Sequence, residues 1–214
     1  MPALGPLPPH RLFEGFLPPA GHRRLLDWTL ANEALFRPSR LVGGLVDPAR
    51  RVSSNLRDLG EMRPMIEAAV TARLADLSAA AGVAPFALEA IELELAHHGD
   101  GAHFAPHLDI AYGPSRGLIG GERGLDQDRL VSAVYYFHAE PKGFTGGALR
   151  LHRFGSRASG EAGSFADVAP RQNALLAFPS IALHEVRPVA VPSGRFEDGR
   201  FALNIWLCRR RAHA

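Results

Sequence analysis

The sequence contains one cysteine, one lysine and no long apolar run. Cys208 is the only cysteine among 214 residues, which excludes an internal disulfide framework and a cysteine-rich zinc site. No uninterrupted apolar stretch reaches the roughly 18 residues that a membrane span needs. The start of the chain, residues 1–9, is rich in proline and lacks the basic and apolar segments of a signal peptide. These absences predict a cytoplasmic protein with no membrane partner.

The near absence of lysine leaves arginine as the basic residue everywhere except at Lys142. The 24 basic and 22 acidic residues give a net charge of +2, and the arginines are scattered along the chain. Nucleic-acid sites generally need a broader basic face, so residues 209–211, three consecutive arginines, indicate a solvated end. No nucleic-acid partner is expected. With 46% hydrophobic and 21% charged residues, residues 1–214 are predicted to form one domain, whose oligomeric state stays open.

Residues 1–85 are predicted to be mainly helical and to support a core formed by residues 86–208. Apolar residues and the absence of internal proline favour a helix over residues 20–36, which ends before Pro38. Apolar positions at steps of three and four predict a second helix over residues 61–81, with Gly82 as its stop. Residues 41–60, between the two, are predicted to be an irregular connection.

The hydrophobic period changes after residue 85. Residues 89–96 alternate between acidic and apolar side chains, which predicts a half-buried antiparallel strand. Further short strands are predicted at residues 131–137, 148–152, 174–178, 183–189 and 201–208. Many short strands without intervening helices favour a mainly β fold of the sandwich or jelly-roll type.

A histidine and an aspartate two positions apart begin the part of the sequence that carries chemistry. In extended backbone the side chains of His107 and Asp109 project to the same side and could bind one metal ion. His184, on a later predicted strand, offers a third ligand. Two histidines and one carboxylate form the facial triad that holds Fe(II) and leaves coordination positions open. A metal centre at these three residues is therefore predicted.

A competing zinc site would use His103 and His107, whose spacing suits one face of a helix. The nearby glycines and Pro106 argue against a helix there. The other histidines in the core half are interpreted as hydrogen-bonding or packing residues: His97, His98, His138 and His152.

The predicted ligands belong to an ordered series of short motifs. These are HLD at 107–109, VSAVYYF at 131–137, GGALRL at 146–151, HEVRPV at 184–189 and RFALNIW at 200–206. The series resembles the Fe(II)/2-oxoglutarate dioxygenases, and within them the prolyl 4-hydroxylase-like branch. The resemblance runs from about residue 91 to residue 207 and implies a double-stranded β-helix core, a jelly-roll or cupin-like fold. It also implies that His107, Asp109 and His184 are the iron ligands.

The resemblance further implies a basic residue on the last core strand that binds the distal carboxylate of 2-oxoglutarate. Arg200 matches this residue, and a guanidinium suits a carboxylate because it offers two parallel hydrogen bonds. The family's basic residue usually lies closer to the distal histidine, which keeps Arg195 as an alternative. A turn signature at residues 197–199 follows Arg195, whereas a strand-like run follows Arg200, so Arg200 is favoured.

Four more residues are candidates for the pocket. Tyr136 matches the family tyrosine that donates a hydrogen bond to the same carboxylate, and its alternative role is packing in the core. A second family tyrosine, which lies ahead of the first iron ligand, is replaced here by His97. In a strand, Asn204 and Trp206 would share a face with Arg200 and could line the pocket.

The implied enzyme is a dioxygenase that uses Fe(II), 2-oxoglutarate and O₂, with L-ascorbate as reductant, and releases succinate and CO₂. Its implied substrate is a prolyl residue in a protein or peptide. Free proline or another small molecule is an alternative substrate, and a metal hydrolase or a non-catalytic metal-binding jelly roll is an alternative function. Residues 110–128 contain several glycines and are predicted to be a substrate-selecting lid.

Overall fold

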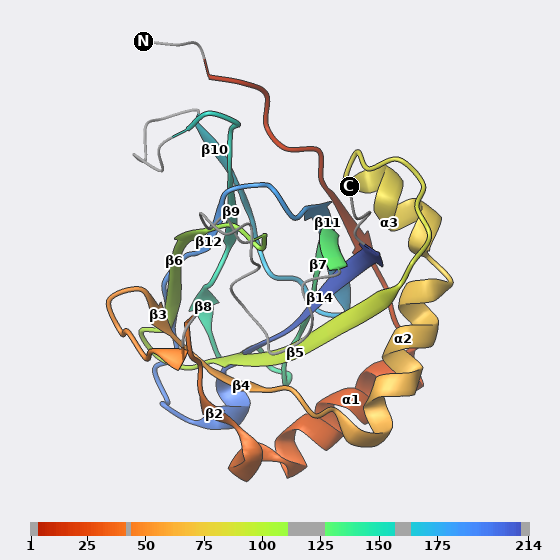
Figure 1. Ribbon diagram of the computed structural model, residues 1–214. Helices are drawn as coiled ribbons and strands as arrows, with labels where there is room; N and C mark the ends of the chain where they lie inside the picture. The colour runs from red at the N-terminus through yellow and green to blue at the C-terminus, as the bar shows by residue number, and fades with distance from the viewer. Residues whose placement is uncertain (1–3, 42–43, 111–126, 157–163, 211–214) are drawn as a thin grey trace.

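Two antiparallel sheets face each other and three helices cover the outer side of the larger sheet (Figure 1). The computed structural model describes residues 4–41, 44–110, 127–156 and 164–210. The larger sheet contains, in spatial order, β1 (Arg11–Glu14), β11 (Ala174–Pro179), β7 (Gln127–Phe137), β14 (Arg200–Arg210), β5 (Ala90–His98), β4 (Ser54–Leu56) and β2 (Arg37–Pro38). The smaller sheet contains β10 (Phe165–Val168), β9 (Leu149–His152), β12 (His184–Val186), β6 (His103–His107) and β3 (Arg51–Val52). A separate pair joins β8 (Thr145–Gly146) to β13 (Val189–Ala190). The predicted jelly roll with supporting helices is confirmed.

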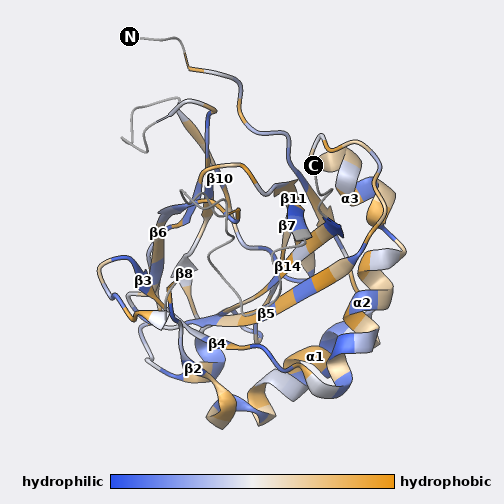
Figure 2. Cartoon of the chain, viewed as in Figure 1, coloured by the Kyte–Doolittle hydropathy of each residue, from blue (hydrophilic) through white to orange (hydrophobic). Residues whose placement is uncertain are grey.

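The two faces of the larger sheet bury different sets of side chains. In β14, Phe201, Leu203 and Ile205 belong to the cluster beneath the helices. Ala202 instead packs in the cluster between the sheets, with Tyr136 of β7 opposite it. This alternation follows from the two-residue repeat of a strand and is visible along β5 in Figure 2. The predicted division of residues 200–206 between two faces is confirmed.

The helices differ in part from the prediction. The helix predicted over residues 20–36 is α1 (Pro19–Ala31), followed by the 3₁₀ turn η1 (Glu33–Leu35). The helix predicted over residues 61–81 is divided into the 3₁₀ turn η3 (Gly60–Met62), α2 (Arg63–Thr71) and α3 (Leu74–Ala80). The division follows two β-branched residues, Val70 and Thr71, whose helix propensity is low. Gly82 ends α3 as predicted, with a φ of +64° that favours glycine.

Several short strands were not predicted. The connection predicted over residues 41–60 contains β3 and β4, which are too short to show alternation and form only because β6 and β5 provide partners. The strand predicted over residues 183–189 is two strands in different sheets, β12 and β13. Pro188 separates them because proline has no backbone donor, and its carbonyl accepts a hydrogen bond from Gly147 N at 3.0 Å.

Asn173 joins the start of the helical layer to the larger sheet. Its side chain accepts hydrogen bonds from Leu17 N at 3.0 Å and from the Tyr135 hydroxyl at 2.9 Å, and donates one to Leu17 O at 2.9 Å. Its φ of 52° lies in the left-handed region, which asparagine tolerates better than alanine does.

We expect Asn173→Ala to lower the free energy of unfolding by about 2 to 4 kcal/mol, because it removes three partly buried hydrogen bonds and strains the backbone. Urea unfolding measures this change. Asn173→Gly keeps the backbone freedom and removes the same bonds, so it isolates their contribution. A loss below about 0.5 kcal/mol in both variants would contradict this role.

Candidate metal centre

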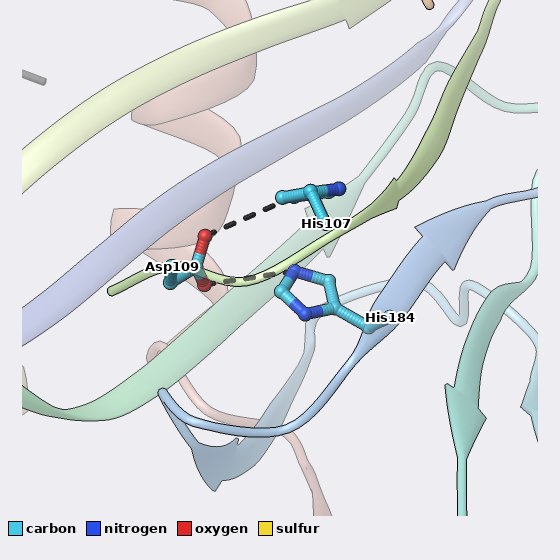
Figure 3. Close-up of side chains that lie close together, drawn as sticks. All are labelled: His107, Asp109 and His184. Carbon is cyan, nitrogen blue, oxygen red and sulfur yellow. Dashed lines mark ion pairs between the residues drawn. The ribbon is translucent and has the colours of Figure 1, made fainter. Parts of the chain in front are cut away.

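Three potential metal ligands from two neighbouring strands converge between the sheets (Figure 3). His107 ends β6, Asp109 follows two residues later, and His184 begins β12. The antiparallel register places His107 directly opposite His184. One ligand atom from each residue lies within 4.8 Å of the other two. The Asp109 carboxylate is 3.8 Å from Nε2 of His107 and 3.6 Å from Nε2 of His184.

Both imidazoles are oriented by their other ring nitrogen. Nδ1 of His107 donates to the carbonyl of Ala105, and Nδ1 of His184 donates to the carbonyl of Ala182, each at 2.9 Å. These bonds leave each Nε2 with its lone pair directed at the cluster. Burial, together with the nearby His184, lowers the pKa of His107 to about 3, so that this ring is neutral at pH 7.

Asp109 is held by polar contacts to its side chain and to its backbone. The Ser132 hydroxyl donates to its Oδ2 at 2.6 Å, and its backbone N–H donates to Ser180 O at 3.2 Å. Arg129 donates to its backbone carbonyl at 3.2 Å. Burial opposes ionisation, but the two histidines and the hydrogen bonds from Ser132 and Trp206 outweigh it and hold the pKa of Asp109 below its usual value.

The donor set fits a divalent transition metal. Two imidazoles and one carboxylate on one side of an ion leave its other coordination positions free, which is typical of non-haem Fe(II) sites. His103, the residue of the competing zinc interpretation, lies outside this group. It is on a strand, not a helix, and its Nδ1 donates to Gly101 O at 3.2 Å.

A buried arginine without a carboxylate partner lies on the inner face of β14. Arg200 is 1% exposed, and among the residues that the structure describes no carboxylate lies within ion-pair distance of it. One of its terminal nitrogens, Nη1, donates to Nδ1 of His98 at 3.1 Å. Its Nε and the hydroxyl of Tyr136 are both buried without a hydrogen-bond partner, and the guanidinium lies 5.0 Å from the centre of the Tyr136 ring.

An uncompensated buried charge is costly, so this arrangement favours binding of an anion. Burial lowers the pKa of Arg200 from its usual value, although an arginine remains charged at pH 7. Burial also raises the pKa of Tyr136 to about 12, so its hydroxyl keeps its proton and can donate it in a hydrogen bond. Gly147 allows the guanidinium to fit here, because a Cβ at that position would lie 2.6 Å from Cδ of Arg200.

Arg195, the alternative to Arg200, lies on the surface. It precedes the 3₁₀ turn η4 (Phe196–Asp198), and its side chain is 62% exposed. Its Nε donates to Asp198 Oδ2 at 2.9 Å and lies 3.4 Å from Glu197 Oε1. The turn expected at this point is therefore present, and the guanidinium has carboxylate partners of its own.

His97 does not lie on the face that carries Arg200, contrary to the prediction. It is paired with Phe201 in the sheet, and its ring packs against Phe201 and Phe196 on the helix side. The next residue, His98, is opposite Arg200 and contacts it. The prediction was wrong by one residue, which in a strand reverses the face.

Asn204 and Trp206 do share the inner face with Arg200. Asn204 is opposite Glu94 of β5, and Trp206 is opposite Ser132 of β7. The Arg129 guanidinium stacks 3.9 Å from the centre of the Trp206 ring. Glu94 is 4% exposed, so β5 is buried on both faces rather than half-buried as predicted. The predicted lid over residues 110–128 lies mostly outside the described residues.

The buried position of His97 predicts a loss of stability in acid. Burial lowers the pKa of this imidazole to about 4, against about 6.5 in an unfolded chain. Between these values the unfolded state binds a proton that the folded state excludes. The contribution of the neutral, buried His97 to the free energy of unfolding is therefore complete above pH 6.5 and is lost as the pH falls toward 4.

We expect the titration of His97 to lower the free energy of unfolding by about 2 kcal/mol as the pH falls from 7.5 to 5. His97→Phe should fit among the neighbouring rings and remove that part of the pH dependence. Urea unfolding of both proteins at the two pH values measures it. Equal losses in the parent and the variant would show that other groups carry the acid sensitivity.

Comparison with known proteins identifies the class. The family model for the 2OG-Fe(II) oxygenase superfamily matches residues 93–208, more than half of the chain. The chain therefore belongs to the 2OG-Fe(II) oxygenase superfamily. The match contains the three clustered ligands and the buried arginine.

Individual relatives agree with this class. An uncharacterized PKHD-type hydroxylase of Synechocystis is 31% identical over 148 residues, which are 68% of this chain and 45% of that protein. The chain thus spans less than half the length of this curated relative. A prolyl-4-hydroxylase of Pseudomonas putida has a similar structure, with a TM-score of 0.65 and 24% identity over 94% of both chains.

A prolyl hydroxylase of Trichoplax adhaerens, solved with a peptide fragment of a hypoxia-inducible factor, gives the same TM-score at 17% identity. That match covers 93% of this chain and 83% of the other. The fold is therefore that of the prolyl 4-hydroxylase-like oxygenases. Among the described residues, no helix is both long enough and apolar enough to cross a membrane.

Proposed function

We propose that this protein is an Fe(II)- and 2-oxoglutarate-dependent dioxygenase that hydroxylates a prolyl residue in a protein or peptide. The observation that carries the proposal is the buried Arg200, whose charge has no carboxylate partner among the described residues. It lies on the inner face of the same jelly roll as His107, Asp109 and His184. A jelly roll that only binds a metal, or that hydrolyses its substrate, does not need such an arginine, whereas an enzyme that binds a dicarboxylate co-substrate does.

In this proposal His107, Asp109 and His184 hold the iron. Fe(II), when bound with 2-oxoglutarate and O₂, supplies oxidative decarboxylation to succinate and CO₂ together with insertion of one oxygen atom into a substrate C–H bond. The carbonyls of Ala105 and Ala182 fix the ring orientations, and Ser132 fixes the carboxylate.

Arg200 and Tyr136 bind the distal carboxylate of 2-oxoglutarate. The guanidinium offers its unpaired Nε–H, and the Tyr136 hydroxyl offers a second donor. His98 occupies Nη1 of the guanidinium and so limits its rotation. The distal carboxylate of the co-substrate would act as the counter-ion that the buried Arg200 guanidinium lacks, which makes its binding favourable.

The prolyl substrate is supported by the structural relatives. The related structures include prolyl hydroxylases, and one of them was solved with a peptide in place. L-Ascorbate is proposed as the reductant that keeps the iron in its ferrous state. We further propose that residues 1–214 form one domain in which residues 1–85 support the core.

The test is mass spectrometry of a host lysate incubated with the protein, Fe(II), 2-oxoglutarate and ascorbate. Peptides that gain one oxygen on proline, with equal succinate release, support the proposal. Oxygen gain on free proline or another metabolite would replace the substrate class and keep the chemistry. Absence of any succinate that depends on Fe(II) and 2-oxoglutarate would overturn the dioxygenase assignment.

A further inference from the structure

Exposed arginines without ion-pair partners gather on the segment that joins α1 to β5. Arg37, Arg40 and Arg50 are exposed, and none has a carboxylate partner among the described residues. Within the described part of the chain, Arg37 and Arg40 donate to nearby backbone carbonyls, those of Ala34, Phe36 and Gly44. Arg57, at the end of the same segment, is 67% exposed and has an ion-pair partner, Glu94, which it shares with Arg51. We call these four residues the arginine surface.

Arginines elsewhere on the molecule are mostly neutralised. Ion pairs with described carboxylates hold Arg24, Arg63, Arg129, Arg150, Arg171, Arg187, Arg195, Arg209 and Arg210. The arginine surface differs because Arg37, Arg40 and Arg50 form no ion pair with a described carboxylate. Asp47, on the same segment, accepts a hydrogen bond from Ala49 N at 3.0 Å and pairs with none of them among the described residues.

Glu94 does not neutralise the surface either. Its carboxylate lies 2.8 Å from Nη2 of Arg51 and 3.2 Å from Nη2 of Arg57. One negative charge thus meets two positive charges, and the excess falls on the more exposed side chain, that of Arg57. Such an excess attracts anions from solution.

Hydrogen bonds hold the segment as one unit. β2 pairs with β4, and Ser39 N donates to Ser53 O at 2.9 Å. The pairing brings Arg37 opposite Asn55, close to the chain that leads to Arg57. Leu45 and Val46, on the same segment, are exposed apolar side chains.

The segment that carries this surface adjoins the metal centre through Arg51, the neighbour of Arg50. β3 pairs with β6, the strand that ends at His107, and Ala105 N donates to Arg50 O at 2.7 Å. The guanidinium of Arg51 lies 4.7 Å from the centre of the Phe104 ring. That ring stacks on His107 with 3.6 Å between centroids. β3, which directly follows Arg50, therefore lies beside the strand that carries His107 (Figure 1).

We infer that the protein substrate presents an acidic segment beside the modified residue, which binds to the arginine surface. This inference rests on the proposed function, in which the bound chain is the substrate. Carboxylates are the protein groups that complement unpaired guanidiniums, and opposite charges accelerate the encounter of the two chains. The patch is small and mixed with exposed leucine and valine, which favours an acidic peptide over a nucleic acid.

The test uses fluorescence anisotropy with three labelled ten-residue peptides, each with one central proline. Their flanking residues are glutamate, glutamine or lysine. The protein is loaded with Fe(II) and 2-oxoglutarate without oxygen. An oligonucleotide with the same charge as the glutamate peptide is a fourth probe. We expect the glutamate peptide to bind at least roughly 10-fold more tightly than the glutamine peptide, and the preference to shrink as salt rises.

The variant Arg40→Glu/Arg50→Glu should abolish this preference. Arg11→Glu/Arg23→Glu is the matched control, because it makes the same charge change on β1 and α1, where Arg11 and Arg23 are exposed and unpaired with described carboxylates. The control should keep the preference. Succinate formation without peptide, measured in air, should be unchanged in both variants.

Equal binding of the glutamate and glutamine peptides, or an equal loss of binding in both double variants, would overturn the inference. Tighter binding of the oligonucleotide would also overturn it and assign the surface to nucleic acid. Lack of succinate in the parent protein would count against the proposed function alone, since the anisotropy comparison does not depend on turnover.

Discussion

Replacing Asp109 or His184 by alanine is expected to abolish 2-oxoglutarate turnover, with a reduction of at least about 1,000-fold. Each residue supplies one of three protein ligands, and those ligand atoms lie within 4.8 Å of one another. Removal of either leaves two ligands, which hold a divalent ion weakly. Succinate formation and bound iron, measured on the same samples, check this expectation.

Asp167→Ala is the matched control for Asp109→Ala. This carboxylate pairs with Arg150 on the outer side of the smaller sheet, at 2.7 and 2.8 Å, and it lies outside the ligand group. It should retain iron and turnover. Thermal unfolding would show whether each variant remains folded. Near-normal turnover in a folded Asp109→Ala or His184→Ala variant would disprove the proposed ligand set.

Arg200→Ala is expected to raise the apparent 2-oxoglutarate constant by roughly 30-fold to 1,000-fold. The substitution leaves one carboxylate of the co-substrate without its charged partner at a buried position. Such a loss costs on the order of 2 to 4 kcal/mol. Iron binding should survive, because Arg200 is not a ligand. The measurement is the 2-oxoglutarate dependence of succinate formation at saturating Fe(II).

Arg195→Ala is the control for this prediction. It removes the same charge from a side chain that is 62% exposed and already paired with Asp198. The apparent 2-oxoglutarate constant should stay within a few-fold of the parent value, since exposed charges contribute little. A large increase in Arg195→Ala together with a parent-like Arg200→Ala would assign the co-substrate to the surface arginine and disprove the proposed anion site.

The sequence pattern was most informative for the long central strands. Residues 131–137 and 201–208 become β7 and β14, because each alternates residues that fit two buried faces of one sheet. The short strands gave no such signal. β3, with two residues, is a strand only because β6 lies beside it, and no local pattern can report a partner fifty residues away.

The position of His97 depends on more than the alternation of side chains along its strand. The alternation in β5 correctly separates odd from even positions, but it does not say which set faces the other sheet. The packing of Phe196 and Phe201 beneath the helices decides that His97 belongs to the outer face. His98 therefore takes the position next to Arg200.

The sequence by itself determined the residue types of the candidate site and the family to which the chain belongs. An imidazole and a carboxylate two residues apart in an extended segment must project to one side, whatever surrounds them. The sequence also proposed His184 as the third ligand and favoured Arg200 over Arg195. Only the tertiary structure shows that His184 lies opposite His107, and that Arg200 is buried while Arg195 is exposed. The reason is that burial and ligand convergence depend on contacts between strands that are far apart in the chain, and only the packed jelly roll brings those strands together.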